Sequence, residues 1–388
     1  MNLEAQLSAS LASAYAAIAG QPVDPVVRRS QHADFQSDAS LQLARTLRRA
    51  PRDIAAEVVA RAAFDGLATA SVSGPGFINL TVDDSVIAAA VAGPVEIPRT
   101  TSPQTVVIDY SAPNVAKEMH VGHLRSTIIG DAAARLLEQI GHDVRRANHL
   151  GDWGTPFGML VEHLQEHPAG DDLTAFYQAA RARFDADEDF RTRSRRRVVA
   201  LQGGDEQTLA LWRELVARSE RHFLAVYDRM GITLSPDDFV GESFYNDMLP
   251  GVVDDLSDLG LLLQSEGALC AFPAGFTGRD GEPLPLIVRK SDGGFGYAAT
   301  DLAAVRYRVG MLHADRMLYV VGTPQRTHFR MVWAVAREAG WIPSQVSVEH
   351  VAFGSILGRD GKPFKSRSGD TIRLAELLDE AVTRASEL

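Results

Sequence analysis

The 388-residue chain contains a single cysteine, Cys270. One thiol excludes an internal disulfide framework and a cysteine-based zinc site, and it favours a reducing compartment. No apolar run reaches the length that a helix needs to span a bilayer. The N-terminus does not have the pattern of a secretory signal, because Glu4 comes early and the first basic residue is Arg28. We therefore expect a cytoplasmic protein with no membrane contact.

The sequence also lacks a G-x-x-x-x-G-K-[ST] string, which excludes a P-loop nucleotide site. Neither an internal repeat nor a low-complexity tract occurs. The formal net charge is −11, so a surface that binds nucleic acid would have to be local. Apolar residues make up 45% of the chain and charged residues 23%, as in ordinary globular proteins, and the length allows two or three domains.

The first hundred residues predict a separate α+β module. Helical patterns at 3–19, 39–48 and 51–63 precede two short strands, 68–72 and 77–81, which read as a hairpin. Three prolines between 93 and 104 indicate a linker.

From Thr105 the pattern changes to strands alternating with helices. A strand at 105–110, a helix at 123–140 and a strand at 143–148 predict a right-handed parallel crossover. Residues 160–235 are mostly helical and charged, which indicates an insertion between two halves of a sheet. Further strands are expected at 284–289, 317–321 and 346–353.

The stretch Ser111–Ser126 carries the strongest functional signal. The first strand of the α/β part ends in a turn at Pro113-Asn114, and His120-Val121-Gly122-His123 then begins the helix. Helix N-termini attract anions, and two imidazoles beside Lys117 suit a polyphosphate. Gly122 lets a flat base approach the backbone. The alternative is a capped helix with two incidental histidines, which the surrounding strand, turn and glycine make less favourable.

This stretch and its continuation Arg146–Gly154 resemble the ATP-site signature of arginyl-tRNA synthetases, which are class I synthetases. The tetrad at 120–123 matches the His-Ile-Gly-His signature of that class. The resemblance covers essentially the whole chain and implies an α/β fold. Its core would be a Rossmann-like parallel sheet with a helical insertion, preceded by a small α+β N-terminal domain. Relatives continue into a helical anticodon-binding domain, which we expect this chain to lack because the sequence stops at Leu388.

The resemblance implies five segments. They are an N-terminal tRNA-contacting domain (1–100), the first half of the nucleotide-binding core (105–160), a mainly helical connective insertion (161–240), the second half of the core (241–352), and a phosphate-closing loop with the start of a linker helix (353–388).

A second signature of the class is a loop that closes on the phosphates, and Gly354–Gly369 resembles it. Its glycines permit hinge motion, and its cations can meet leaving pyrophosphate. Ser366 replaces the usual second lysine, and the resemblance gives that role to Lys117. Taken alone, this stretch reads as a solvated basic hairpin loop. The implied ATP-binding residues are His120, Gly122, His123, Lys362, Lys365 and Ser366, and the implied catalytic residues are Lys117, His120, His123, Lys365 and Arg367.

The stretch Asp292–Ala303 resembles the guanidinium-reading segment of the family. Tyr297 and Asp301 are four residues apart, so one helical turn brings them to the same face. A carboxylate meets a guanidinium through a planar fork that an ammonium cannot copy. The implied arginine-binding residues are Asn114, His123, Glu242, Tyr297, Asp301 and Gln325. Without the family, Glu242 reads as a surface glutamate, Tyr297 as a core aromatic and Asp301 as a helix cap beside Thr300.

Two further features bear on the site and on RNA. Pro156 stands where the family often has glutamine, which could alter a turn near the site. The arginine-rich run 191–197 either meets an RNA acceptor stem or forms a solvated helix face. Acidic residues at 185–189 could neutralise much of this run and favour the second reading.

The resemblance implies ATP-dependent activation of L-arginine to arginyl-adenylate, followed by transfer to tRNA(Arg). Mg²⁺ would arrive with ATP, and no protein-bound metal is expected. The implied partners are L-arginine, ATP and tRNA, contacted at its acceptor end and elbow, and a monomer is favoured. The family usually needs bound tRNA before it activates arginine.

Other functions stay open. One is a stand-alone arginine-activating paralogue that passes the arginyl group to an acceptor other than tRNA. Another is a non-catalytic relative that binds arginine or tRNA. A split or truncated form of an ordinary synthetase would also fit the sequence.

Overall fold

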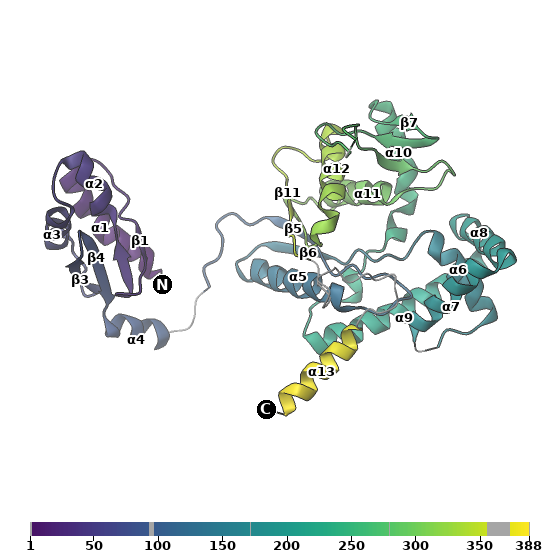
Figure 1. Cartoon of the computed structure of the whole chain (residues 1–388), viewed down its shortest axis with the longest axis horizontal. Coiled ribbons are helices and arrows are strands. Elements are labelled where there is room, and N and C mark those ends of the chain that lie inside the picture. Colours follow the sequence, from purple (N-terminus) through teal and green to yellow (C-terminus); the bar gives the residue numbers. More distant parts are fainter. Residues whose placement is uncertain (1, 93–96, 171, 279, 355–372, 388) are drawn as a thin grey trace. The chain divides into compact units, whose positions relative to one another are not determined.

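The computed structural model describes residues 2–92, 97–170, 172–278, 280–354 and 373–387. The chain divides into two compact units, Met1–Ile97 and Pro98–Leu388 (Figure 1). Within the described residues, none of the helices is both long enough and apolar enough to cross a membrane.

The first unit packs three helices on an antiparallel sheet whose strand order is β1-β2-β4-β3. Its elements are α1 (Leu3–Ala19), β1 (Val27–Arg29), β2 (Phe35–Ser37), α2 (Ala39–Leu47), α3 (Pro51–Arg61), β3 (Ala68–Ser73), β4 (Phe77–Val82) and α4 (Asp84–Ala92). The hairpin expected from the sequence is confirmed as β3 and β4. The two strands β1 and β2 are only three residues long, and the sequence analysis missed them.

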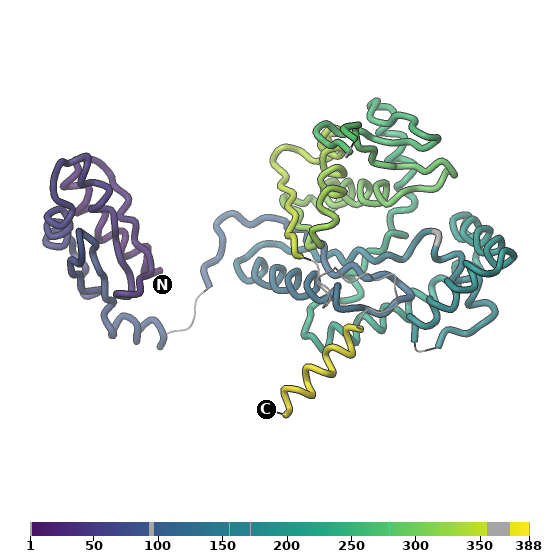
Figure 2. Tube along the Cα trace, in the orientation of Figure 1, coloured from purple at the N-terminus to yellow at the C-terminus, as the bar shows by residue number. Residues whose placement is uncertain are grey.

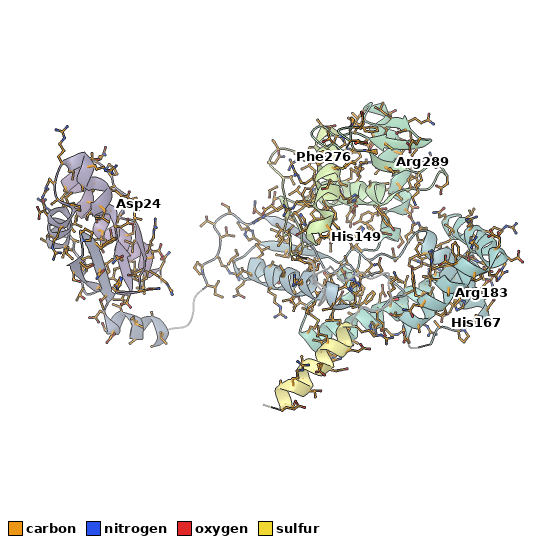
Figure 3. The ribbon with its side chains drawn as sticks, viewed as in Figure 1. Asp24, His149, His167, Arg183, Phe276 and Arg289 are labelled. Carbon is orange, nitrogen blue, oxygen red and sulfur yellow. The ribbon has the colours of Figure 1, made fainter. Side chains whose placement is uncertain are left out.

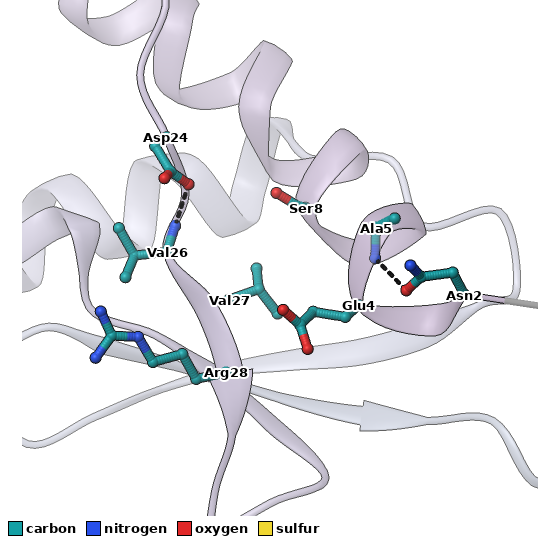
Figure 4. Close-up of a pocket in the computed structure, with 8 residues that line it drawn as sticks. All are labelled: Asn2, Glu4, Ala5, Ser8, Asp24, Val26, Val27 and Arg28. Atoms are coloured by element: carbon teal, nitrogen blue, oxygen red, sulfur yellow. Dashed lines mark hydrogen bonds between the residues drawn. The ribbon is translucent and has the colours of Figure 1, made fainter. Parts of the chain in front are cut away.

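A surface depression lies beside the start of α1 (Figure 4). Asn2 caps the helix by accepting a hydrogen bond from the Ala5 amide at 3.0 Å. Asp24 accepts a hydrogen bond from the Val26 amide at 2.9 Å. Both polar side chains therefore accept hydrogen bonds from nearby backbone amides.

The second unit contains the elements from β5 onward. They are β5 (Thr105–Asp109), α5 (Val121–Gln139), β6 (Asp143–Ala147), α6 (Thr155–Glu166), α7 (Leu173–Ala186), α8 (Glu188–Gln202), α9 (Glu206–Met230), η1 (Pro236–Asp238), η2 (Glu242–Met248), α10 (Leu249–Asp258), β7 (Leu263–Ser265), β8 (Ala268–Ala271), β9 (Leu286–Arg289), α11 (Tyr297–Gly310), β10 (Arg316–Tyr319), η3 (Thr323–Gln325), α12 (Arg326–Glu338), β11 (Ser347–His350) and α13 (Leu374–Ser386).

The central sheet of this unit is parallel, with strand order β11-β10-β5-β6. The expected α/β fold with a parallel sheet is thereby confirmed. A second, smaller sheet joins β7, β8 and β9 in antiparallel fashion. The sequence predicted only β9 of these three strands, because β7 and β8 are too short for a clear alternating pattern.

Side chains alternate across the parallel sheet and join two apolar cores. Val106 and Ile108 of β5 pack with residues of α5, α6 and α9, whereas Val107 packs with residues of α10, α11 and α12. Figure 1 shows α5 on one side of the sheet and α11 and α12 on the other. The result is a three-layer arrangement with helices on both faces of the sheet.

The strand order reverses between β5 and β10. From β5 the chain passes through α5 to β6 on one side, whereas β10 and β11 extend the sheet on the other side. The tube in Figure 2 shows these later segments beside β5, although they are far apart in sequence. In parallel α/β sheets, ligands bind outside the carboxyl ends of the strands at such a reversal. The fold therefore predicts that the functional site includes residues that follow Asp109 and Tyr319.

A buried ion pair joins the sheet to α11. Arg308 is 1% exposed and donates to Asp109 Oδ2 at 2.6 Å. Burial alone would lower the pKa of Arg308, but Tyr319, Asp109 and Tyr245 outweigh it and raise that pKa well above its ordinary value. This pair fixes the end of β5 just before the turn at 111–116.

Three arginines of the run 191–197 form ion pairs within the helical insertion α6–α9. Arg193 and Arg197 contact the buried carboxylate of Glu162 on α6 at 2.8 and 3.0 Å. Arg191 pairs with Glu188 on its own helix. Acidic residues at 185–189 therefore neutralise part of the run, Glu188 at Arg191 and the charge of Asp187 at Arg193. Glu162 of α6 is the carboxylate that contacts both Arg193 and Arg197.

Candidate functional site

The turn after β5 is held in an unusual backbone conformation. Ser111, Ala112 and Ala116 have φ values of +71°, +48° and +59°. A residue with a Cβ pays of order 1–2 kcal/mol for such a conformation. Neighbouring contacts must therefore stabilise this turn, and they come from α9 and from Asn148.

Asn148 and Tyr227 hold the start of this turn. The Ala112 amide donates to Asn148 Oδ1 at 2.9 Å, and Asn148 Nδ2 donates to the Tyr227 hydroxyl at 3.0 Å. The same hydroxyl lies 2.7 Å from Ser111 Oγ. Tyr227 is 1% exposed, so these bonds form away from solvent.

Two more side chains of α9 hold the neighbouring segments. Ser219 Oγ accepts from the Ala116 amide at 2.9 Å, and the Trp212 indole donates to the Asp152 carbonyl at 2.7 Å. Together with Tyr227 they recur at intervals of seven and eight residues, so they share one face of the helix. The sequence analysis assigned α9 to a connective insertion and missed this role. The signal available was the spacing of these polar and aromatic residues.

His120 and His123 form a reciprocal cap at the start of α5. The Gly122 amide donates to His120 Nδ1 at 3.0 Å, and the His120 amide donates to His123 Nδ1 at 3.1 Å. Their ring centroids lie 4.0 Å apart. Because each Nδ1 accepts a backbone proton, each neutral ring carries its own proton on Nε2.

Both imidazoles are held neutral. Burial, helped by the charge of Lys117, lowers the pKa of His120. Burial, together with the neighbouring His120 and Lys117, lowers the pKa of His123 to about 3. The pair can therefore present two Nε2–H donors at physiological pH without carrying charge.

Lys117 and Gly122 lie beside the two histidines at the start of α5, and we call these four residues the imidazole corner. Lys117 Nζ lies 4.0 Å from the centroid of the Tyr177 ring on α7. A Cβ at position 122 would come within 2.8 Å of the His120 ring, so glycine leaves room for that imidazole. The expected purpose of Gly122, close approach of a base, stays a prediction.

The end of β6 meets η2 through Asp152. Ser243 donates to both carboxylate oxygens of Asp152, from its amide at 2.8 Å and its hydroxyl at 2.6 Å. Burial raises the pKa of Asp152, although the Ser243 bonds oppose the rise. Asp152 belongs to the stretch 146–154, but its sequence pattern alone indicates no role for it.

Glu242 lies beside Asp152 in a cluster of carboxylates. Burial raises the pKa of Glu242 to about 8, and the charges of Asp152 and Asp301 add to the rise. The nearby Trp153 backbone opposes the rise but does not outweigh it. The charges of Asp152, from the loop after β6, and of Asp301, from α11, thus both act on Glu242 of η2, and the surface-glutamate reading of Glu242 is wrong.

Asp301 lies in the second turn of α11 and contacts a histidine. Its Oδ2 lies 2.6 Å from Nε2 of His328 on α12. The N-cap of α11 is Gly296, so the reading of Asp301 as a helix cap is wrong. His328 escaped the sequence analysis because a lone histidine in a helical pattern gives no local signal.

The remaining predicted arginine-binding residues lie on loops and helix ends. Asn114 pairs with Gly151 through a parallel bridge, and a Cβ at Gly151 would overlap the Asn114 side chain. Tyr297 is the first residue of α11 and is 71% exposed, so the core-aromatic reading is wrong. Gln325 ends η3 on an exposed surface. Pro156 occupies the first turn of α6, where proline costs no helical hydrogen bond.

The predicted phosphate-loop residues Lys362, Lys365, Ser366 and Arg367 lie outside the described residues. The described residues on either side contact the corner at His120. Arg125 of α5 donates to the Gly354 carbonyl at 2.7 Å. On the far side, the Leu374 amide donates to the Met119 carbonyl at 2.9 Å, and Arg373 contacts Glu118 at 2.9 Å.

Figure 3 labels one histidine near the centre of the second unit and two residues of its helical insertion. His149 lies centrally, whereas His167 and Arg183 lie in the helical insertion. His149 stacks on Tyr245 with ring centroids 5.6 Å apart. Within the part of the chain that the structure describes, no group of three or more His, Cys, Asp or Glu side chains could hold a metal ion.

Comparisons with known proteins identify the family of the chain. A family model described as "tRNA synthetases class I (R), catalytic domain" matches residues 86–388, and one described as "Arginyl tRNA synthetase N terminal domain" matches residues 1–82. A relative from Thermobifida fusca (strain YX), named arginine–tRNA ligase, is 55% identical over 378 residues. That match covers 94% of this chain and 65% of the relative.

Two further comparisons extend the likeness. An arginine–tRNA ligase from Frankia casuarinae is 53% identical over 384 residues, covering 93% of this chain and 65% of the relative. The crystal structure of arginyl-tRNA synthetase from Plasmodium falciparum matches with a TM-score of 0.74 and 26% identity, covering 99% of this chain and 68% of that one. The chain thus spans less than two thirds of the length of both curated relatives. By these matches, the chain belongs to the arginyl-tRNA synthetase family of class I tRNA synthetases.

Proposed function

We propose that this chain activates L-arginine with ATP to form arginyl-adenylate and transfers the arginyl group to tRNA(Arg). The observation that carries the proposal is the placement of two unlike groups at one sheet edge. The paired imidazoles of His120 and His123 begin the helix that follows β5. Glu242, whose amide donates to the Leu150 carbonyl just after β6, feels the charge of Asp301 on α11. One group suits a polyphosphate and the other a cation.

The carboxylate cluster would select the guanidinium group. An arginine side chain is planar, permanently charged and able to form two parallel bonds to a carboxylate. Glu242 and Asp301 lie close enough for one charge to raise the pKa of the other, so a cation between them would relieve their repulsion. Tyr297 and Gln325 would border the same pocket, and Asn114 with His123 would hold the α-amino and carboxylate end.

The imidazole corner would bind ATP. His120 and His123 would donate their Nε2 protons to phosphate oxygens, and Lys117 would add a full charge. Gly122 would border the nucleotide, while Lys362, Lys365, Ser366 and Arg367 would meet the β- and γ-phosphates. Mg²⁺ would arrive with ATP, held by phosphate oxygens and water.

The reaction needs no nucleophile from the protein. One carboxylate oxygen of arginine attacks the α-phosphorus, the bond to the β-phosphate oxygen breaks, and pyrophosphate leaves. The terminal ribose hydroxyl of tRNA then attacks the arginyl carbonyl, and AMP leaves. Catalysis would come from alignment and from donors placed where negative charge builds.

The test is arginine-dependent ATP–pyrophosphate exchange with and without tRNA(Arg), followed by charging of the tRNA. Exchange that needs tRNA, together with charging, supports the proposal. Exchange without RNA and no charging would favour a paralogue with another acceptor. No exchange under any condition would favour a binding protein without catalysis.

A pair of variants tests the role of the corner lysine. If Lys117 stabilises the phosphates, Lys117→Ala should reduce exchange at least tenfold, since a charged hydrogen bond is worth about 1.5–3 kcal/mol. Arg145→Ala is the matched control, because Arg145 is exposed in β6 and pairs with Asp143. Equal activity of the two variants would remove Lys117 from the mechanism.

A further inference from the structure

His328 contacts Asp301, the carboxylate that we propose binds the guanidinium group of arginine. Its Nε2 lies 2.6 Å from Asp301 Oδ2, a short charge-assisted distance. The Asp301 side chain is 16% exposed and that of His328 is 34% exposed, so the contact is partly shielded from water. α11 and α12, which carry the two residues, pack together in one core.

We propose that His328 is a positioning residue for arginine recognition, which fixes the Asp301 carboxylate through Oδ2 and controls how much of its charge is left to attract a guanidinium. The inference rests on the proposed function, in which Asp301 reads the guanidinium. His328 lies on α12, whereas the carboxylate that it would position lies on α11.

The two charge states of His328 have opposite consequences. A neutral ring donates its Nε2 proton, which restricts the Asp301 rotamer and leaves the carboxylate fully charged. An imidazolium forms an ion pair with the same carboxylate and competes with the substrate cation. Burial alone would lower the pKa of His328, but the hydrogen bond to Asp301 and its charge outweigh burial and raise it. The competing charged state therefore persists to higher pH than it would for a free imidazole.

Other ionisable groups face the pair and also titrate. Glu242 of η2 feels the charge of Asp301, and Asp152 lies beside Glu242. Tyr319 of β10 has its pKa raised by burial first, and the charge of Asp301 contributes to that rise. A pH profile of wild-type protein alone would mix the titrations of Glu242 and His328, so the test must change His328 without changing Glu242.

Two substitutions separate the hydrogen bond from the charge. His328→Gln keeps an N–H donor at the Nε2 position and cannot be protonated. His328→Ala removes the donor. The KM for arginine and the kcat are measured by ATP–pyrophosphate exchange with tRNA(Arg) between pH 6 and 8.5. His142→Gln, at the start of β6, is the matched control.

The Gln variant should keep a KM within about twofold of wild type at pH 8.5 and show a smaller rise in KM toward pH 6. The Ala variant should raise KM about tenfold at pH 8.5, as expected for loss of a bond to a charged group, with kcat changed less. A wild-type pH profile in His328→Gln, or an unchanged KM in His328→Ala, overturns the inference. Absence of arginine-dependent exchange in the wild type refutes the proposed function and this inference together, whereas active wild type with unaffected variants refutes the inference alone.

Discussion

Arginine binding should release a proton from Glu242. Burial, Asp152 and Asp301 together raise the pKa of this carboxyl to about 8. At pH 7 such a group is protonated in about 0.9 of the molecules, and at pH 9 in about 0.1. A guanidinium beside the carboxylate favours the charged form and lowers its pKa toward the ordinary range. The expected release from Glu242 is therefore close to one proton at pH 7 and close to none at pH 9.

Isothermal titration calorimetry measures this release directly. Arginine is titrated at each pH in two buffers with different ionisation enthalpies, and the difference in observed heat gives the protons released per arginine. In a His328→Gln background, in which residue 328 has no proton to release, Glu242→Gln should lose most of the release at pH 7. Glu220→Gln is the matched control, because burial and Asp152 raise the pKa of Glu220 as well, but it lies on α9. Equal release at pH 7 and pH 9, or full release in Glu242→Gln, would refute the assignment of Glu242 to the guanidinium pocket.

Three further substitutions test the framework of the site. Tyr227→Phe removes the hydroxyl that binds Ser111 and Asn148, so the free energy of unfolding measured in urea should fall by about 1–2 kcal/mol; no change would mean that the turn does not depend on it. Asp109→Asn leaves Arg308 buried without its carboxylate and should cost about 3–5 kcal/mol, whereas the exposed control Asp143→Asn should cost at most about 1 kcal/mol. Glu162→Gln removes the buried partner of Arg193 and Arg197 and should increase hydrogen exchange in α6 and α8, while the exposed control Glu214→Gln should not; equal exchange in both variants would contradict the structural role of Glu162.

The sequence predicted the architecture well where the signals are local. The helix expected at 3–19 is α1, and the strand–helix–strand unit after Thr105 is β5, α5 and β6. These elements have long periodic patterns, clear glycine or proline boundaries, or both. The helix α5 begins two residues earlier than expected, at Val121, because His120 is its N-cap.

The contacts that organise the site could not be predicted in the same way. The bonds of Tyr227 join residues that are 79 and 116 positions apart, and the His328–Asp301 contact joins α12 to α11. Such pairs depend on how helices pack on the sheet, and neither residue has a local pattern that reveals its partner. The convergence of Glu242 with Asp152 likewise depends on η2 returning to the end of β6.

The face of α9 has a practical consequence for attempts to shorten the protein. The segment between β6 and β10 contains the helical insertion, which is an obvious target for deletion in a shortened chain. Ser219 and Tyr227 lie within that segment and hold the strained turn, and Trp212 holds the Asp152 carbonyl. A trimmed version should therefore keep residues 206–230, because removing them would let the backbone at 111–116 relax out of the shape that nucleotide binding would need.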